Sequence, residues 1–216
     1  MSRSLKDAAY AELARIGKAL ASPVRVEILD VLSQAPRDVE SLAGAISRPV
    51  ASTSQHLQVL AAARLVVRER DGVRRIYGLA DGVDQLLATV ERAGFSLLAE
   101  LPAHRADHLA EHPTVQAVTD AEVHALVARG EAVLVDVRPE AEFHHVHLPG
   151  ARSVPLAELE DALADLPPDI EIIACCRGPW CDWADEAVER LQAAGRRARR
   201  FEGRPYADGS ATVPVG

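Results

Sequence analysis

Three cysteines lie close together late in the chain, at positions 175, 176 and 181. An apolar run over residues 171–175 leads directly into Cys176, and a helical pattern starts near Trp183. A loop between a strand and a helix start presents backbone N–H groups and the positive end of a helix dipole. Both favour a thiolate, which is the reactive form of cysteine. The sequence therefore predicts a nucleophile at Cys176, with positive charge added by Arg177.

The other two cysteines have different expected roles. Cys181 lies five residues after Cys176, at the far end of the same loop. Its attack on a Cys176 persulfide would give a disulfide or a sulfur-bridged pair. Cys175 comes just before the nucleophile on the expected strand, so its side chain should point to the opposite face, into a core. A zinc site made from the three cysteines lacks an obvious fourth ligand, and we expect neither a metal nor a cofactor.

The elements around this loop alternate between helix and strand. We expect helices over residues 120–129, near residue 140, over 156–163 and from about 183 to 194, and strands at 132–136, near 154, and at 171–175 and 198–201. Such alternation is typical of an α/β domain with a mainly parallel sheet. Ligands of these sheets bind beyond the carboxyl ends of the strands, which is where Cys176 lies.

The first half of the chain has a different pattern. Apolar periodicity predicts helices over 7–20, from Ser22-Pro23 onward, over 38–45 and over 50–63, followed by two β-type runs around Asp71-Gly72. The last three of these helices, followed by the hairpin, predict a mainly α winged helix-turn-helix. Residues 83–112 read as helical, with an interruption at Pro102. We therefore expect two domains: residues 1–112 for DNA binding and dimerisation, a linker at 113–118, and the α/β domain at 119–216.

The charge distribution agrees with this division. The whole chain carries a net charge of −8, but residues 1–100 have a net charge of +1 and residues 101–216 a net charge of −9. Residues 48–75 contain six arginines and only two acidic residues. A local basic patch on an acidic protein is what a phosphate-contacting surface requires. Double-stranded DNA is the expected partner of this segment.

Residues 18–29 and 52–60 resemble the ArsR family of dimeric repressors, and the resemblance covers about residues 10–100. It implies that residues 50–62 form the recognition helix and that the hairpin is a wing holding DNA. The expected DNA-binding residues are Ser52, Ser54, Gln55, His56 and Gln58 on the helix and Arg68, Arg70, Arg74 and Arg75 on the wing. It also implies a homodimer through the first and last helices of the domain, where Leu86, Leu87, Val90, Phe95 and Leu97 would pack.

Metal sensing is less well supported by the residues. The metal-sensing members of that family often carry paired cysteines in the third helix, where this chain has residues 37–41 without a soft ligand. His104, His108 and His112 do recur every four residues. One helical face would then present either a zinc-type site or a solvated charged surface, although the family's ligand spacing is not reproduced.

Residues 133–143 and 147–151, together with the cysteine loop and Glu202-Gly203, resemble the rhodanese domain over about residues 117–214. The resemblance implies that Cys176 accepts sulfane sulfur and that Asp136, Arg138 and His147 order the loops around it. Phosphatase and arsenate-reductase loops are similar, but they need an arginine six residues after the cysteine. Asp182 stands at that position and would repel a phosphate, which argues against phosphoryl chemistry.

These observations lead to one hypothesis and two alternatives. The hypothesis is a DNA-binding transcriptional regulator, a repressor by its resemblance, whose second domain senses or processes reactive sulfur from a small donor through a persulfide on Cys176. The alternatives are a sulfurtransferase that the winged helix only localises or dimerises, and a constitutive repressor with a vestigial sulfur domain. No apolar run approaches the roughly 20 residues of a membrane span, and the N-terminus lacks a signal-peptide core, so we expect a cytoplasmic protein without membrane contact.

Overall fold

The computed structural model describes residues 3–205, and its contacts divide the chain into two units after Leu87. The division falls inside helix α5 (Val83–Leu97), whereas the sequence predicts it at residues 113–118. The difference arises because the second part of α5 and all of α6 (Glu100–Glu111) make their contacts with the C-terminal unit. No described helix is long and apolar enough to cross a membrane.

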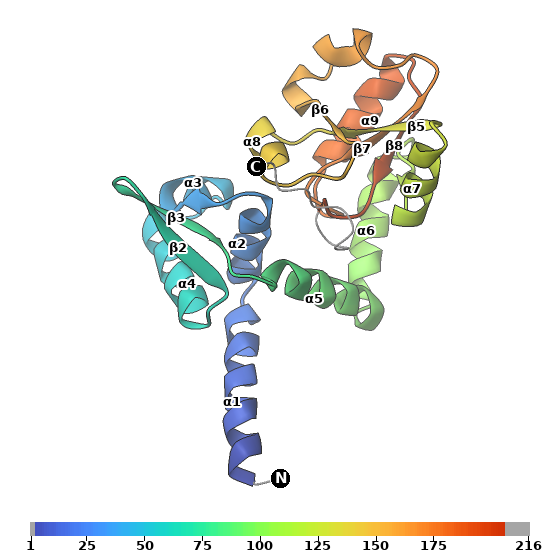
Figure 1. Cartoon of the computed structure of the whole chain (residues 1–216). Coiled ribbons are helices and arrows are strands. Elements are labelled where there is room, and N and C mark those ends of the chain that lie inside the picture. Colours follow the sequence, from blue (N-terminus) through green and yellow to red (C-terminus); the bar gives the residue numbers. More distant parts are fainter. Residues whose placement is uncertain (1–2, 206–216) are drawn as a thin grey trace. The chain divides into compact units, whose positions relative to one another are not determined.

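The N-terminal unit is a winged helix-turn-helix, as the sequence predicts (Figure 1). Its elements are α1 (Arg3–Leu20), α2 (Pro23–Gln34), β1 (Arg37–Asp38), α3 (Val39–Ala45), α4 (Val50–Ala62), β2 (Val66–Asp71) and β3 (Arg74–Leu79). The three strands form an antiparallel sheet in the order β1-β3-β2. Apolar side chains of α2, α3 and α4 form the core, and the most buried are Ile28, Leu29, Leu32, Leu42, Leu57 and Leu60.

Local sequence signals explain where these elements begin and turn. Pro23 occupies the first turn of α2, where a missing N–H costs nothing. The Asp38 side chain accepts a hydrogen bond from the Ser41 N–H at 2.8 Å and so caps α3. Gly72 turns the β2–β3 hairpin with a φ of 58°, and the strands meet at the pair Asp71 and Arg74.

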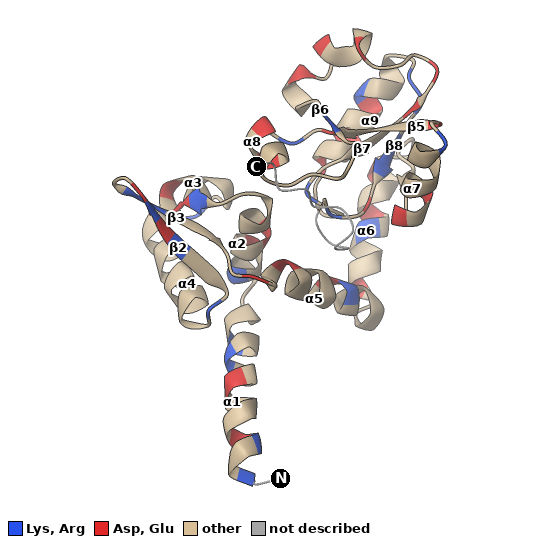
Figure 2. Ribbon diagram, in the orientation of Figure 1, with Lys and Arg blue, Asp and Glu red and all other residues tan. Residues whose placement is uncertain are grey.

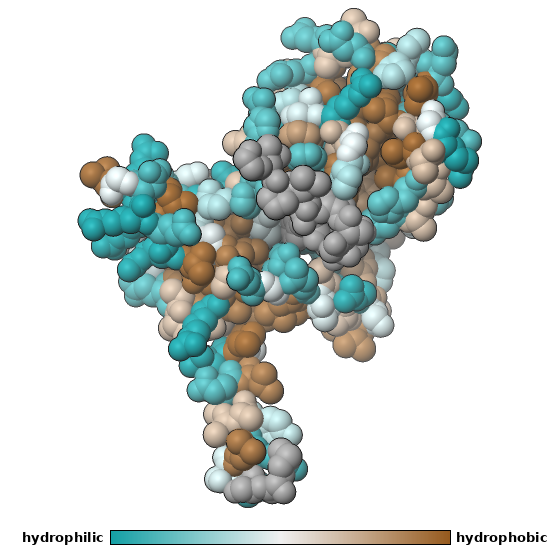
Figure 3. All heavy atoms as spheres, in the orientation of Figure 1, coloured by the Kyte–Doolittle hydropathy of each residue, from teal (hydrophilic) through white to brown (hydrophobic). Residues whose placement is uncertain are grey.

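Helix α1 keeps most of its apolar side chains outside the core of its unit. Leu5, Tyr10 and Leu13 are 58–63% exposed, and the only buried residue of the helix is Ala19. Figure 3 shows brown, hydrophobic spheres at several places along this helix. An apolar helix face of this size is a common sign of an interface.

The C-terminal unit is an α/β domain with a parallel sheet, again as predicted. After α5 and α6, its elements are β4 (Ala117–Val118), α7 (Asp120–Ala128), β5 (Ala132–Asp136), α8 (Glu140–His145), β6 (Arg152–Ser153), two 3₁₀ turns (Leu156–Glu158 and Asp161–Ala164), β7 (Glu171–Cys175), α9 (Trp183–Ala193) and β8 (Ala198–Phe201). The five strands lie in the order β4-β8-β7-β5-β6, and each neighbouring pair is parallel.

Three local predictions differ from the structure. The interruption of the long helical pattern lies at Leu98 and Ala99, because Pro102 is tolerated in the first turn of α6. The helix expected over residues 156–163 is replaced by the two 3₁₀ turns. Ala117 and Val118, expected in a linker, pair with β8 as an edge strand, and Val118 is buried.

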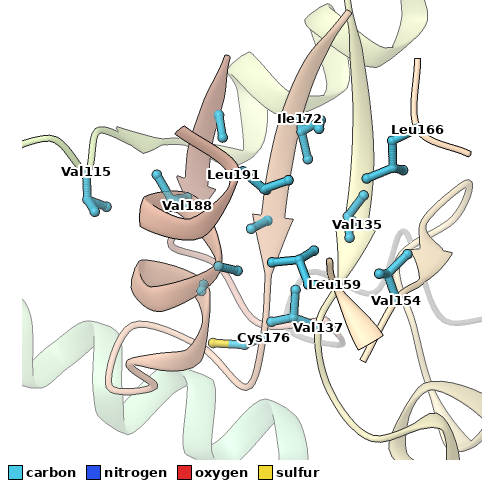
Figure 4. Close-up of a cluster of buried hydrophobic side chains, with 14 residues drawn as sticks. Val115, Val135, Val137, Val154, Leu159, Leu166, Ile172, Cys176, Val188 and Leu191 are labelled. Atoms are coloured by element: carbon cyan, nitrogen blue, oxygen red, sulfur yellow. The ribbon is translucent and has the colours of Figure 1, made fainter. Parts of the chain in front are cut away.

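The parallel sheet has a separate core on each face. Val135, Ile172, Ala174 and Cys176 belong to the cluster that packs against α9, shown in Figure 4. Leu134, Ile173 and Cys175 belong to the cluster on the other face. Consecutive strand residues alternate between faces. The two adjacent cysteines therefore point to opposite sides of the sheet, as the sequence predicts for Cys175.

Candidate functional site

The cysteine loop connects the carboxyl end of β7 to the start of α9, at the sheet edge where parallel α/β folds bind ligands. Cys176, its first residue, is only 1% exposed and packs in the core cluster beside Val137 and Ala184. Figure 4 shows the Cys176 side chain near Val137, with its sulfur on the side away from Val137. Cys181, at the other end of the loop, is half-buried.

The two thiols of the loop lie close together. The Cys176 sulfur lies 3.5 Å from the Cys181 carbonyl oxygen and 3.9 Å from the Gly178 carbonyl oxygen, and each thiol shifts the pKa of the other. Cys181 accepts hydrogen bonds from the backbone N–H groups of Arg177 and Trp183. The loop thus offers proton acceptors to one sulfur and proton donors to the other.

These surroundings separate the acidities of the two thiols. The hydrogen bond from Cys176, the two backbone N–H groups and the charge of Arg177 lower the pKa of Cys181 to about 7. Burial and the adjacent Cys181 sulfur raise the pKa of Cys176 well above its ordinary value. The sequence predicts the thiolate at Cys176, but the contacts favour it at Cys181, because a short loop folded over a core removes Cys176 from water.

Arg177 does not point freely toward solvent. Its guanidinium donates to both carboxylate oxygens of Glu142 at 2.7 and 2.9 Å, and Glu142 is 2% exposed. The guanidinium carbon also lies 4.3 Å from the centre of the Trp183 ring, which is a cation–π contact. Arg177 therefore ties the loop to α8 and to the start of α9 while it adds positive charge near Cys181.

Asp136 and Arg138 form a fully buried ion pair behind the loop. The Arg138 guanidinium donates to both Asp136 carboxylate oxygens, and Nη2 also donates to the Val146 carbonyl oxygen at 2.7 Å. His147 donates from Nδ1 to the Phe143 carbonyl oxygen at 2.8 Å and stacks on the Phe143 ring. These contacts hold the segment after β5, and the ordering of the loops around Cys176 by these residues stays an expectation from the resemblance.

Two further arginines hold the loop from the side of β8. Arg200 is completely buried, pairs with Asp185 at 2.7 Å and donates to the Gly178 carbonyl oxygen at 3.2 Å. Arg204 donates to the Arg177 carbonyl oxygen, and its Cγ lies 3.0 Å from where a Cβ on Gly178 would stand. Gly178 has a φ of 128°, a conformation suited to glycine. Arg200 and Arg204 therefore hold the loop in place, and each of them forms an ion pair with a carboxylate.

The tip of the loop contacts the second part of α5, within the C-terminal unit. The Trp180 ring stacks on Phe95 with centroids 5.2 Å apart, and its Nε1 donates to Glu91 at 2.6 Å. Arg204 donates to the same Glu91 carboxylate at 2.7 and 3.1 Å. A cavity of about 360 Å³ borders this contact and is lined by Glu91, Phe95, Pro179 and Arg204 among others.

The residues predicted to bind DNA lie together in the N-terminal unit. On α4, Gln55 and Gln58 are exposed and Ser52, Ser54 and His56 are partly exposed, while Thr53, Leu57 and Leu60 face the core. Arg68, Arg70, Arg74 and Arg75 are all exposed on the β2–β3 hairpin. Figure 2 shows their positive charge as blue segments along this hairpin.

Comparison with known proteins agrees with this two-part architecture. Residues 22–67 match the model of the arsR family of bacterial regulatory proteins, and residues 119–203 match that of the rhodanese-like domain. The HTH-type transcriptional regulator Rv0324 of Mycobacterium tuberculosis is 40% identical over 198 residues, which span 91% of this chain and 87% of the relative. The chain belongs to the ArsR family of transcriptional regulators. It carries a C-terminal rhodanese-like domain.

Other relatives share only one half of this regulator. The HTH-type transcriptional repressor SmtB of M. tuberculosis is 44% identical over 79 residues, covering 37% of this chain and 56% of the relative. The solution structure of the homodimeric DNA-binding domain of a possible ArsR-family regulator from Mycobacterium bovis is 36% identical, with a TM-score of 0.43, and covers 46% of this chain and 93% of that one.

Sequence reasoning missed the acidic partners of the regulator's loop. Glu142, Asp185 and Glu91 each hold an arginine that contacts the loop, yet none belongs to a motif of its own. Glu142 and Asp185 lie on helices with acidic first turns, where they read as ordinary helix-start residues. Their burial depends on packing between elements distant in sequence, so only the fold reveals it.

The row of histidines on α6 is engaged in packing within the C-terminal unit. His108 lies 2.9 Å from an Asp185 carboxylate oxygen and His112 lies 2.8 Å from a Glu189 oxygen, both on α9. Within residues 3–205, no cluster of three or more His, Cys, Asp or Glu side chains is arranged to hold a metal ion. The alternative of a solvated charged surface holds for only part of this helix face, because His108 and His112 bond to carboxylates of α9.

This contact predicts a pH dependence of stability. The hydrogen bond to Glu189 raises the pKa of His112, and the charges of Glu189, Asp185 and Glu111 act in the same direction. A raised pKa in the folded state adds stability that is complete below the ordinary value of about 6.5 and is lost as pH rises through the folded-state pKa. We therefore expect urea unfolding, followed by tryptophan fluorescence, to show a larger fall in stability from pH 5.5 to pH 8 in the unmodified regulator than in His112→Gln. Equal falls in the two proteins would contradict this assignment.

Proposed function

We propose that this regulator is a dimeric, DNA-binding repressor whose rhodanese-like domain responds to reactive sulfur through a persulfide on Cys176. The observation that carries the proposal is the contact between the cysteine loop and α5. This helix begins with Val83 and Leu87 in the core of the N-terminal unit and continues to Glu91 and Phe95, which bind the loop. A movement of the cysteine loop would therefore act on a helix whose first residues belong to the DNA-binding half.

DNA binding is supported by the exposed polar face of α4 and by the arginines of the wing. Short hydroxyl and amide side chains such as Ser52, Gln55 and Gln58 suit base edges and phosphates in the major groove. The wing arginines suit phosphate contacts, which position a protein without reading sequence. The repressor assignment draws on the relative SmtB, a transcriptional repressor that is similar to this chain in the DNA-binding half.

Replacing one wing arginine should weaken DNA binding in a characteristic way. The Arg74 side chain is 72% exposed, with a long contact of 3.8 Å to Asp38. We expect Arg74→Ala to lower affinity for operator and unrelated DNA alike and to reduce the salt slope by about 1, since one phosphate contact is lost. Fluorescence anisotropy at several salt concentrations measures this, with Arg129→Ala in the rhodanese-like domain as the control. An unchanged salt slope in Arg74→Ala would contradict the wing assignment.

Homodimer formation is supported by the apolar side chains that α1 and α5 leave exposed. On α5, Val90 is 43% and Leu97 is 79% exposed, in addition to the residues of α1 described above. Two residues expected in the dimer contact have other partners, because Leu87 lies in the core of its own unit and Phe95 stacks on Trp180. The proposed interface is therefore narrower on α5 than the sequence suggests.

Sulfur handling is supported by the paired thiols and by the charges around them. A thiolate attacks a sulfur donor and the donor's own thiol leaves. The three arginines at the loop are paired with Glu142, Asp185 and Glu91, so they are not free to bind the sulfonate oxygens of a donor such as thiosulfate, a group that persulfides and polysulfides lack. We therefore propose persulfides and polysulfides as the donors. A sulfur atom added to the 1% exposed Cys176 has no room without movement of the loop.

The test compares DNA affinity with the sulfur content of the same sample. The regulator is treated with polysulfide, its intact mass and modified peptides are determined, and its affinity for DNA from upstream of its own gene is measured. The proposal expects one added sulfur on Cys176 and release from DNA, and neither effect in Cys176→Ser. Sulfur uptake without a change in affinity would contradict it. Turnover of thiosulfate that is lost in Cys176→Ser, without any effect on DNA, would favour the sulfurtransferase alternative.

A further inference from the structure

The two thiols of the loop differ in their access to a donor molecule. Cys176 is 1% exposed and belongs to the core cluster, whereas Cys181 is half-buried at the end of the loop where α9 starts. A donor needs an approach path in line with its sulfur–sulfur bond. Cys176 offers no such path while the loop keeps this conformation, and Cys181, packed at the margin of the same cluster, is the more exposed of the two.

The hydrogen-bond partners of the two sulfurs also differ: those of Cys176 favour the thiol, and those of Cys181 favour the thiolate. The Cys176 sulfur lies 3.9 Å from the Gly178 carbonyl oxygen and 3.5 Å from the Cys181 carbonyl oxygen, and these acceptors stabilise the protonated thiol. One backbone hydrogen bond at Gly178 acts in the other direction and favours the thiolate. Cys181 receives two backbone N–H groups, one of them from Trp183 at the start of α9. Such donors, like the positive end of a helix dipole, stabilise a charged sulfur.

We propose that Cys181 is the nucleophile that first attacks the sulfur donor, and that Cys176 receives the sulfur atom from it. This inference rests on the proposed sulfur response and reverses the order suggested by the position of Cys176 after the strand. It makes Cys181 the entry thiol, in contact with the donor, and Cys176 the buried thiol that holds the sulfur.

The two steps balance without an oxidant other than the donor. In the first, the Cys181 thiolate attacks the outer sulfur of a persulfide R–S–SH, the donor's sulfur–sulfur bond breaks, and R–S⁻ leaves with the electron pair. In the second, the Cys176 sulfur attacks the outer sulfur of the Cys181 persulfide while its proton passes to the leaving Cys181 sulfur. The products are a Cys176 persulfide and a restored Cys181 thiol. The Cys176 sulfur lies 3.5 Å from the carbonyl oxygen of Cys181, so the two residues are already neighbours for this transfer.

The lowered pKa of Cys181 agrees with this order. The thiolate is the form that attacks a donor, so the lowered pKa gives Cys181 a larger reactive fraction near neutral pH than an ordinary cysteine has.

The experiment maps where sulfur and an alkylating agent arrive first. The full-length regulator is mixed with sodium tetrasulfide at pH 7, quenched with iodoacetamide at times from milliseconds to minutes, and digested for mass spectrometry. We expect modification of Cys181 to precede modification of Cys176. In Cys181→Ala, sulfur uptake on Cys176 should be at least tenfold slower, whereas Cys175→Ala, which changes the cysteine on the opposite face of the sheet, should match the unmodified protein.

The possible outcomes separate this order from the proposed function. Uptake on Cys176 at the original rate in Cys181→Ala, or labelling of Cys176 before Cys181, overturns the order and leaves the sulfur response intact. Absence of sulfur uptake in the unmodified regulator overturns both. If Cys181→Ala folds poorly, the order of iodoacetamide labelling in the unmodified protein decides the question alone: Cys181 first supports the proposal, and Cys176 first overturns it.

Discussion

Replacing Arg138 with leucine should destabilise the rhodanese-like domain by about 3–5 kcal/mol, because the change leaves the Asp136 carboxylate charged and buried without its partner. Both side chains are 0% exposed, and the guanidinium makes hydrogen bonds to both Asp136 oxygens and to the Val146 carbonyl oxygen. The measurement is urea unfolding followed by tryptophan fluorescence. Both tryptophans of the chain, Trp180 and Trp183, lie in this unit, so the signal reports its unfolding alone.

Two controls make this prediction specific to the buried pair. Arg129→Leu breaks an exposed pair with Glu131 and should leave the unfolding transition unchanged. The double variant Asp136→Leu/Arg138→Leu removes both charges and should recover much of the loss, because no unpaired charge remains. A loss below about 1 kcal/mol in Arg138→Leu would show that the pair does not hold the segment after β5.

Replacing Glu91 with alanine should disconnect the DNA-binding half from the sulfur state. The Glu91 carboxylate accepts hydrogen bonds from Trp180 and from Arg204, and Arg204 in turn holds the Arg177 carbonyl of the loop. We expect Glu91→Ala to take up sulfur on Cys176 at the original rate, but the change in DNA affinity should fall from tenfold or more to less than about twofold. A tenfold change corresponds to about 1.4 kcal/mol of coupling free energy.

The neighbouring residue on α5 offers a matched control for Glu91. Arg92 is exposed and its side chain donates to Thr89 on the same helix, so Arg92→Ala should keep the full response. Phe95→Leu removes the stacking partner of Trp180 and should weaken the response in the same direction as Glu91→Ala. A full sulfur response in both Glu91→Ala and Phe95→Leu would mean that coupling does not pass through this contact.

The sequence was sufficient for the fold and for part of the site. Periodicity, the Asp71-Gly72 turn and helix-start residues such as Pro23 are local signals, so they predict the winged helix and the parallel sheet correctly. The positions of Cys175 and Cys176 on opposite faces also follow from strand alternation. What the sequence did not reveal depends on contacts between distant segments.

The acidity of the two thiols is the clearest example. A thiolate at Cys176 is expected from a loop before a helix, but burial of that residue and the N–H groups received by Cys181 reverse the expectation. The link to α5 is another example, since Glu91 and Arg204 are 113 residues apart. Neither residue type nor spacing indicates such a pair.

We expect sulfur on Cys176 to lower the affinity of the regulator for DNA. Fluorescence anisotropy on DNA from upstream of its own gene, at one fixed salt concentration, tests it directly with fully reduced protein and with protein treated with polysulfide. We predict an affinity at least tenfold weaker after treatment, equivalent to about 1.4 kcal/mol, and no change in Cys176→Ser. Tight binding that is the same before and after sulfur uptake would contradict the claim and separate the functions of the two halves.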